Sequence, residues 1–248
     1  MKNSQDQVIV ITGGNSGIGL GTAELFKQQG AKVITNARNQ QRLDETKAQH
    51  NGLFDAIIKA DLSKTDEIES FFRKIGERYG KIDVLFLNAG VAYFAPLEQL
   101  TEELYDSQFN LNVKSLLFSA KAALPFLSEG SSILVNTSIN GRIAMPASSI
   151  YSATKAAARS ISLVLASELV DRGIRVNAIA PGPIETPIFG KMGMPEEQRN
   201  ETAESIRSQV PMGRFGKVDE VASLAYEVTT NRFITGQEFV VDGGMSAL

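Results

Sequence analysis

Short apolar runs alternate with helical patterns along the whole chain. Runs of four or five residues, rich in β-branched side chains, predict strands that are buried on both faces of a parallel sheet. The predicted strands are Val8–Thr12, Lys32–Asn36, Ala56–Lys59, Asp83–Leu87, Ser132–Asn136, Arg175–Ala178 and Glu238–Val241. Helical patterns lie between them at about 17–29, 39–49, 64–79, 102–128, 150–173 and 217–229.

This alternation predicts βαβ units and an α/β fold, with a Rossmann-like doubly wound parallel sheet of about seven strands and helices on both faces. The chain has 248 residues and shows no linker, repeat or low-complexity segment, so one domain over 1–248 is expected. Proline and glycine gather at 181–195, after a predicted strand. This cluster of proline and glycine residues predicts a lid-like substrate loop at about 183–210.

Composition excludes several classes of function. The net charge of −3 argues against a nucleic-acid partner. The absence of cysteine excludes disulfides and thiol chemistry. The apolar run after the polar N-terminus is too short for the core of a signal peptide, and no run approaches a transmembrane length. A cytoplasmic protein without a membrane partner is therefore expected.

Acidic pairs occur at 66–67, 102–103, 196–197 and 219–220, each at the start of a helical pattern. Negative charge in a first turn stabilises the helix dipole, so helix capping is favoured over metal or acid/base chemistry. The single histidine, His50, is interpreted as a surface residue that ends the second predicted helix. With one histidine and no cysteine, no metal site and no Ser-His-Asp triad are predicted.

A glycine-rich turn directly after the first predicted strand opens the first helical pattern. Its spacing, Gly13-x-x-x-Gly17-x-Gly19, differs from the G-x-G-x-x-G fingerprint, but the mechanics are the same. Free N–H groups and the helix dipole both favour an anion there, so the phosphates of a nucleotide are expected on the turn. The alternative is a tight turn without a ligand. The segment is Thr12-Gly13-Gly14-Asn15-Ser16-Gly17-Ile18-Gly19.

The end of the second predicted strand distinguishes between two dinucleotides. An NAD site usually places an acidic residue about 20 residues beyond the glycines. Positions 35–39 hold no acid, and Arg38 offers a forked donor suited to a 2′-phosphate. NADP(H) is therefore favoured, NAD(H) stays possible, and Asn15 and Ser16 are expected to add hydrogen bonds. The alternative is that Arg38 is a surface residue at the start of the next helix.

Tyr151 and Lys155 are four residues apart in a helical pattern and therefore share one helix face. The pair alone is weak evidence, because such pairs occur by chance. Ser138 ends the fifth predicted strand thirteen residues before Tyr151. Open α/β sheets bind their ligands at this carboxyl edge, so the three residues predict a reaction site there.

Six motifs occur in order between Val8 and Gly244. They are the glycine turn, Asp61-Leu62, Asn88-Ala89-Gly90, the set Asn112, Ser138, Tyr151 and Lys155, the segment Pro181-Gly182-x-x-x-Thr186, and Val241-Asp242-Gly243-Gly244. Over nearly the full length, the chain thus resembles the short-chain dehydrogenase/reductases of the shorter, single-domain subgroup. It is similar to 3-oxoacyl-carrier-protein reductases and glucose dehydrogenase-like members. Its departures are Ala37-Arg38, which is expected of NADP members, and a less apolar segment at 228–232.

The resemblance implies reversible hydride transfer between a nicotinamide ring and a carbonyl or alcohol carbon. Tyr151 would protonate the carbonyl oxygen, and Ser138 would orient it. Lys155 would bind the nicotinamide ribose and bring the pKa of Tyr151 from near 10 toward about 7. Asn112 would hold a water that links Lys155 to solvent.

Other residues are assigned to the cofactor by the same resemblance. Asp61 and Leu62 would hold the adenine, and Asn88, Ala89 and Gly90 would stabilise the sheet beside the cofactor. Pro181, Gly182, Ile184 and Thr186 would fix the nicotinamide end. Two alternatives are a non-catalytic NADP(H)-binding sensor or scaffold on the same fold, and an isomerase or dehydratase of the longer, extended branch.

The predicted substrate is a small carbonyl or alcohol compound that is neutral or partly apolar. Arg142 is interpreted either as a contact for an anionic group or as a surface residue. A homotetramer is expected from the resemblance, with the helical patterns at 102–128 and 150–173 available for pairing. The predicted lining residues are Val91, Tyr93, Phe94, Asn140, Ile143, Met145, Ile188, Phe189, Met192 and Met194.

Overall fold

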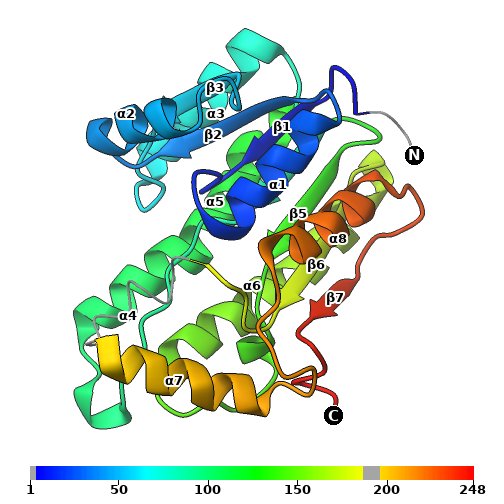
Figure 1. Ribbon diagram of the computed structural model, residues 1–248. Helices are drawn as coiled ribbons and strands as arrows, with labels where there is room; N and C mark the ends of the chain where they lie inside the picture. Colours follow the sequence, from blue (N-terminus) through cyan, green and yellow to red (C-terminus); the bar gives the residue numbers. More distant parts are fainter. Residues whose placement is uncertain (1–3, 187–195) are drawn as a thin grey trace.

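The computed structural model describes residues 4–186 and 196–248 of the chain (Figure 1). Seven parallel strands form one sheet in the order β3-β2-β1-β4-β5-β6-β7, which confirms the predicted fold class. The strands are β1 Val8–Ile11, β2 Lys32–Ala37, β3 Ala56–Lys59, β4 Val84–Leu87, β5 Ser132–Asn136, β6 Arg175–Pro181 and β7 Glu238–Val241.

Helices cover both faces of the sheet, because successive residues of a buried strand point to opposite sides. Val8 and Val10 pack with α3, α5 and α6, whereas Ile9 and Ile11 pack with α1 and α8 on the other face. The helices are α1 Gly17–Gln28, α2 Gln40–Gln49, α3 Thr65–Tyr79, α4 Glu102–Phe109, α5 Ser115–Ala123, α6 Ser149–Leu169, α7 Glu196–Gln209 and α8 Val218–Thr230.

The strand order reverses between β1 and β4. The chain first winds outward from β1 to β3 and then returns to β4 before it winds the other way to β7. Ligands of open parallel sheets bind at such a switch point, outside the carboxyl ends of the strands. The glycine turn after β1 and the Asn88 turn after β4 both lie at this position.

The helical pattern predicted over 102–128 is not one continuous helix. Helix α4 passes through a π-helical turn, Asn110–Lys114, into α5, and a short 3₁₀ turn, Leu124–Phe126, follows. A π turn inserts an extra residue into the helix, and such turns are often found at functional sites. This one contains Asn112, a predicted catalytic residue.

Helix α7 is absent from the predicted helix ranges and falls within the predicted substrate loop at 183–210, although the acidic pair at 196–197 is interpreted as the start of a helical pattern. It contains few apolar residues and therefore lacks the periodic stripe that reveals a helix.

The acidic pairs at the starts of α3, α4 and α8 lie in first turns, as predicted. His50 is the C-cap residue of α2 and is half-buried, with its ring edge-on to Phe54. Within 4–186 and 196–248, no helix is long and apolar enough to cross a membrane.

Candidate active site

The glycine turn after β1 leaves the N-terminus of α1 open to an anion. Gly13 and Gly17 adopt φ values of 65° and 51°, which L side chains rarely take. A Cβ on Gly19 would lie 2.5 Å from both Asn88 Nδ2 and the Gly13 carbonyl oxygen. The N-cap residue Ser16 makes no side-chain capping bond, and the first turn of α1 holds no acid. Helices α3, α4 and α8 carry acids in their first turns, whereas α1, like α2, α5 and α6, does not, so the positive end of α1 is uncompensated.

Side chains at the end of β2 hold this turn in place. The Gly13 N–H donates to Asn36 Oδ1 at 2.9 Å, and the Gly14 N–H donates to Thr35 Oγ1 at 2.9 Å. The sequence predicts no role for Thr35 or Asn36, because nothing in their spacing points back to the glycines. The Asn15 side chain donates to Thr46 Oγ1 of α2 at 3.2 Å, so in this structure it joins the glycine turn to α2.

Arg38 and Asp61 lie after β2 and β3, where the adenosine end of a dinucleotide is expected. Arg38 is exposed and has no ion-pair partner in the described part of the chain, so its guanidinium is available to a ligand. Asp61 Oδ1 accepts hydrogen bonds from the backbone and side chain of Ser63 at 3.1 and 2.8 Å. These bonds hold the carboxylate in one orientation, and Leu62 behind it is buried.

Asn88 connects three strands at the switch point. Its Nδ2 donates to the carbonyl oxygens of Thr12 and Gly13, each at 3.1 Å, and its Oδ1 accepts from Asn136 Nδ2 at 2.9 Å. The N–H groups of Asn88 and Ala89 both donate to Thr12 Oγ1. The turn after β4 is thereby held against the glycine turn, in agreement with a sheet-stabilising role.

Asn112 ties the π turn to the loop after β4 and to α6. Its Oδ1 accepts from the Val91 N–H at 2.8 Å, and its Nδ2 donates to the Val91 carbonyl at 2.8 Å and to Thr154 Oγ1 at 3.0 Å. Both amide hydrogens are therefore engaged with the protein. The water contact predicted for Asn112 would have to use its backbone carbonyl or the remaining lone pair of Oδ1.

Tyr151 and Lys155 lie on one face of α6, as their spacing predicts. Lys155 Nζ is 5.7 Å from the centre of the Tyr151 ring and donates to the Asn136 carbonyl oxygen at 2.8 Å. The Phe94 ring packs edge-on to the Tyr151 ring with centroids 5.5 Å apart. Ser138, two residues after the end of β5, interacts with the phenol and lowers its pKa. The three predicted groups thus meet at the carboxyl edge of the sheet.

Burial sets the protonation of this pair. It raises the pKa of Tyr151 to about 12, and the Ser138 hydroxyl opposes this only in part. It lowers the pKa of Lys155 to about 8. The expectation that Lys155 brings the pKa of Tyr151 toward 7 is therefore wrong for the chain by itself. The physical reason is desolvation, which disfavours the charged form of both groups.

The lowered pKa of Lys155 has a consequence for stability. Between pH 8 and 10.5 the unfolded chain keeps a proton on this amine that the folded chain has lost, so stability rises with pH. Compared with Lys155→Met, the wild type is expected to gain about 2 kcal/mol in unfolding free energy between about pH 7 and pH 9.5. Urea denaturation at the two pH values measures this difference. If the unfolding free energies of the two proteins changed equally between the two pH values, the lowered pKa of Lys155 would be contradicted.

Arg142 is exposed, as the surface interpretation predicts, but its guanidinium is held in an ion pair. Its Nε lies 2.6 Å from Glu238 Oε2, which Arg159 Nε also contacts at 2.9 Å. Thr137 Oγ1 donates to the other carboxylate oxygen at 2.6 Å. The Glu238 side chain is only 4% exposed, so this network joins β7 to the segment that follows Ser138 and to α6. The separation of 96 positions between Arg142 and Glu238 explains why the sequence did not reveal the pair.

The segment after β6 lies between Ser138 and the glycine turn. The Pro181 carbonyl oxygen is 3.5 Å from Ser138 Oγ, and a Cβ on Gly17 would lie 3.3 Å from the Thr186 methyl group. Gly182 packs so closely on Asp242 that a Cβ would lie 2.6 Å from the Asp242 Cβ. These contacts place the predicted nicotinamide segment between the two ends of the site.

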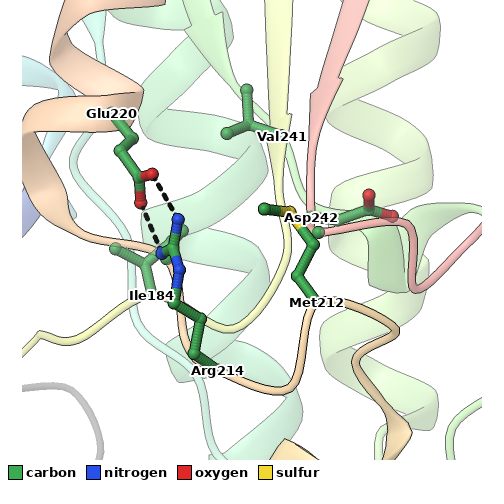
Figure 2. Close-up of a pocket in the computed structure, with 8 residues that line it drawn as sticks. Ile184, Met212, Arg214, Glu220, Val241 and Asp242 are labelled. Carbon is green, nitrogen blue, oxygen red and sulfur yellow. Dashed lines mark hydrogen bonds and ion pairs between the residues drawn. The ribbon is translucent and has the colours of Figure 1, made fainter.

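A separate pocket opens beside this segment (Figure 2). Its walls are mainly apolar, and Arg214 and Glu220 form an ion pair at 2.6 Å across one side. Hydrogen bonds from Arg214 and from the Lys217 N–H lower the pKa of Glu220 to about 2. The pocket shares Ile184 with the predicted cofactor site, but no predicted catalytic residue lines it. Its lining residues are Ile184, Met212, Arg214, Gly216, Glu220, Val241, Asp242 and Gly243.

The predicted substrate-lining residues are only partly described. Phe94 contacts Tyr151, Asn140 adjoins Ser138, and Met145 contacts Asn140, so these three lie around the reaction site. Tyr93 is 40% exposed. Four of the predicted residues, Ile188, Phe189, Met192 and Met194, lie outside the described residues.

Comparisons with known proteins identify the class that this fold and site define. A family model described as Enoyl-(Acyl carrier protein) reductase matches residues 13–246. The 3-oxoacyl-[acyl-carrier-protein] reductase of Thermotoga maritima is 36% identical over 97% of this chain and 98% of its own length. The glucose 1-dehydrogenase of Gluconobacter oxydans is 34% identical over 96% of this chain and 91% of its own.

A solved structure agrees with the sequence comparisons. The chain is similar to a short chain dehydrogenase from Burkholderia cenocepacia in complex with NADP, with a TM-score of 0.88, 29% identity, and coverage of 99% of this chain and 100% of that one. The chain belongs to the short-chain dehydrogenase/reductase family. It is therefore a nicotinamide-dependent oxidoreductase.

Proposed function

We propose that the protein transfers hydride between NADP(H) and a small carbonyl or alcohol compound. The observation that carries this proposal is the meeting of Tyr151, Lys155 and Ser138 at the carboxyl edge of the sheet, beside the glycine turn. The uncompensated N-terminus of α1, the glycines without room for side chains, and the exposed Arg38 together suit a phosphorylated dinucleotide.

The bound nicotinamide would supply or accept the hydride, and side chains of the protein would donate or accept the proton. In reduction, negative charge grows on the carbonyl oxygen. Ser138 would hydrogen-bond this oxygen and Tyr151 would donate its phenolic proton to it. A pKa of about 12 keeps Tyr151 protonated at neutral pH, which suits a proton donor. Oxidation would need the phenolate, and Lys155 in its charged form would favour it.

Arg38 supports NADP(H) over NAD(H). No acid stands at positions 35–39, and a carboxylate there would repel a 2′-phosphate by roughly 4 kcal/mol at about 4 Å and an effective dielectric near 20. The guanidinium instead offers paired donors that match phosphate geometry. The 2′-phosphate is therefore proposed to lie against Arg38.

A screen of carbonyl compounds tests the proposed activity. Ketones, aldehydes and sugars are incubated with NADPH and with NADH, and oxidation is followed at the nicotinamide absorbance. We expect turnover of at least one carbonyl class, faster with NADPH than with NADH at equal concentrations. Binding of NADPH without turnover of any class would instead support a sensor or scaffold, which needs neither the phenol nor the ammonium group.

We also propose a homotetramer and a cytoplasmic location. Exposed apolar side chains on the two long helical segments support assembly, since Leu117 of α5 and Leu163 and Val164 of α6 face away from the core. The absence of cysteine in the chain agrees with a reducing compartment.

A further inference from the structure

We propose that Asn140 is a second substrate-binding residue, which selects carbonyl compounds that carry an oxygen on the carbon next to the reacting carbonyl. The inference rests on the proposed function and names its substrate class. Asn140 lies in the 3₁₀ turn Ile139–Gly141, directly after Ser138. Asn140 is buried, with only 8% of its surface exposed.

Asn140 and Ser138 are neighbours, but no short hydrogen bond between them fixes the Ser138 hydroxyl. The Asn140 N–H donates to Ser138 Oγ at 3.2 Å, and the Ser138 hydroxyl faces Asn140 Oδ1 at 3.4 Å and the Pro181 carbonyl oxygen at 3.5 Å. These two contacts are at the outer limit of hydrogen-bond length, and the other interaction of the hydroxyl is with the Tyr151 phenol in the reaction site itself. The Ser138 hydroxyl can therefore turn to a substrate oxygen, and that oxygen would then lie next to the Asn140 amide.

The Asn140 amide group is buried without a strong acceptor. Its Nδ2 contacts Met145 Sδ at 3.4 Å, and a thioether sulfur is a weak acceptor. Within residues 4–186 and 196–248, no oxygen accepts a hydrogen bond from Nδ2. A buried amide N–H without a strong acceptor costs free energy. A ligand oxygen that accepts its hydrogen would therefore bind favourably.

The position of the amide defines the ligand. With the reacting oxygen on Ser138, the neighbouring amide is within reach of an oxygen on the adjacent carbon, because vicinal oxygens are separated by roughly a hydrogen-bond length. An amide both donates and accepts, so it suits a hydroxyl or keto group. Arg142, whose charge would suit an anionic group, is bound to Glu238. The substrates are therefore α-hydroxy ketones or vicinal diketones in reduction, and vicinal diols in oxidation.

Paired substrates test this inference on the wild type and on Asn140→Leu. Each pair differs only by a methyl group in place of the neighbouring hydroxyl: hydroxyacetone with butanone, and phenacyl alcohol with propiophenone. The ratio of kcat/KM within a pair is compared between proteins, so the intrinsic reactivity of each ketone cancels. We expect the wild type to favour the hydroxy ketone, and Asn140→Leu to lower that preference by about tenfold or more.

Two further variants separate recognition from folding and packing. Asn140→Ala repeats the test with a smaller side chain, and NADPH binding and the melting temperature report whether each variant is folded. Met145→Leu removes the thioether contact but keeps the amide. It is expected to keep the wild-type preference to within about threefold, whatever its effect on absolute rates.

Several results would overturn the inference. If both members of a pair lose activity by the same factor in Asn140→Leu, the residue only positions Ser138. Equal wild-type activity on both members of every pair, or activity only on carbonyl compounds outside the pairs, would also refute it. If no carbonyl compound oxidises NADPH or NADH, the proposed function itself fails and this inference with it.

Discussion

Replacing Tyr151 by phenylalanine is expected to lower kcat by about 100-fold or more. The substitution removes only the phenolic hydroxyl, which is the proposed proton donor to the carbonyl oxygen. The ring stays packed against Phe94, so the fold and the cofactor site are expected to persist. Steady-state turnover with NADPH, stopped-flow traces of the hydride step, and the dissociation constant of NADPH measure the three quantities separately.

A matched control uses a tyrosine away from the site. Tyr105→Phe removes a hydroxyl from the exposed face of α4, where the ring stacks on Phe109, and is expected to leave kcat within about twofold. If Tyr151→Phe kept wild-type turnover while binding NADPH normally, Tyr151 would not be the proton donor. A loss of NADPH binding that explained the whole rate loss would point to a role in the cofactor site instead.

Replacing Arg38 by alanine is expected to weaken NADPH binding by about 10- to 100-fold and to leave NADH binding nearly unchanged. Charge-assisted hydrogen bonds contribute about 1.5–3 kcal/mol, and about 1.4 kcal/mol corresponds to a factor of ten in affinity. Because Arg38 is exposed and outside any ion pair in the described residues, its removal breaks no ion pair there. Fluorescence titrations with the two cofactors measure the effect.

Arg42→Ala is the matched control for this prediction. Arg42 lies four positions further along, on α2, where its guanidinium pairs with Glu45 at 2.9 Å. It is expected to leave the ratio of NADPH to NADH affinity unchanged. An equal loss for both cofactors in Arg38→Ala would mean that the arginine does not contact the 2′-phosphate, and the preference for NADP(H) would lose its support.

Local features of the chain determined most of the fold and the core of the site. The seven apolar runs define the strands, because a strand of a parallel sheet that is covered by helices on both sides is apolar on both of its faces. The glycines at 13, 17 and 19 determine the turn, since two of them adopt positive φ and the third has no room for a Cβ. Tyr151 and Lys155 meet because helix geometry alone places positions four apart on one face.

Contacts between distant segments were decided only by the tertiary structure. The carboxylate of Glu238 reaches Arg142 because β7 pairs with β6 beside the segment after Ser138, and no local pattern encodes that. The π turn at Asn112 depends on partners in two other segments. The pKa values of Tyr151 and Lys155 follow from burial, which depends on the packing of several elements at once. Spacing along a chain reveals which groups can meet, whereas desolvation and long-range pairing arise only when the elements are packed together.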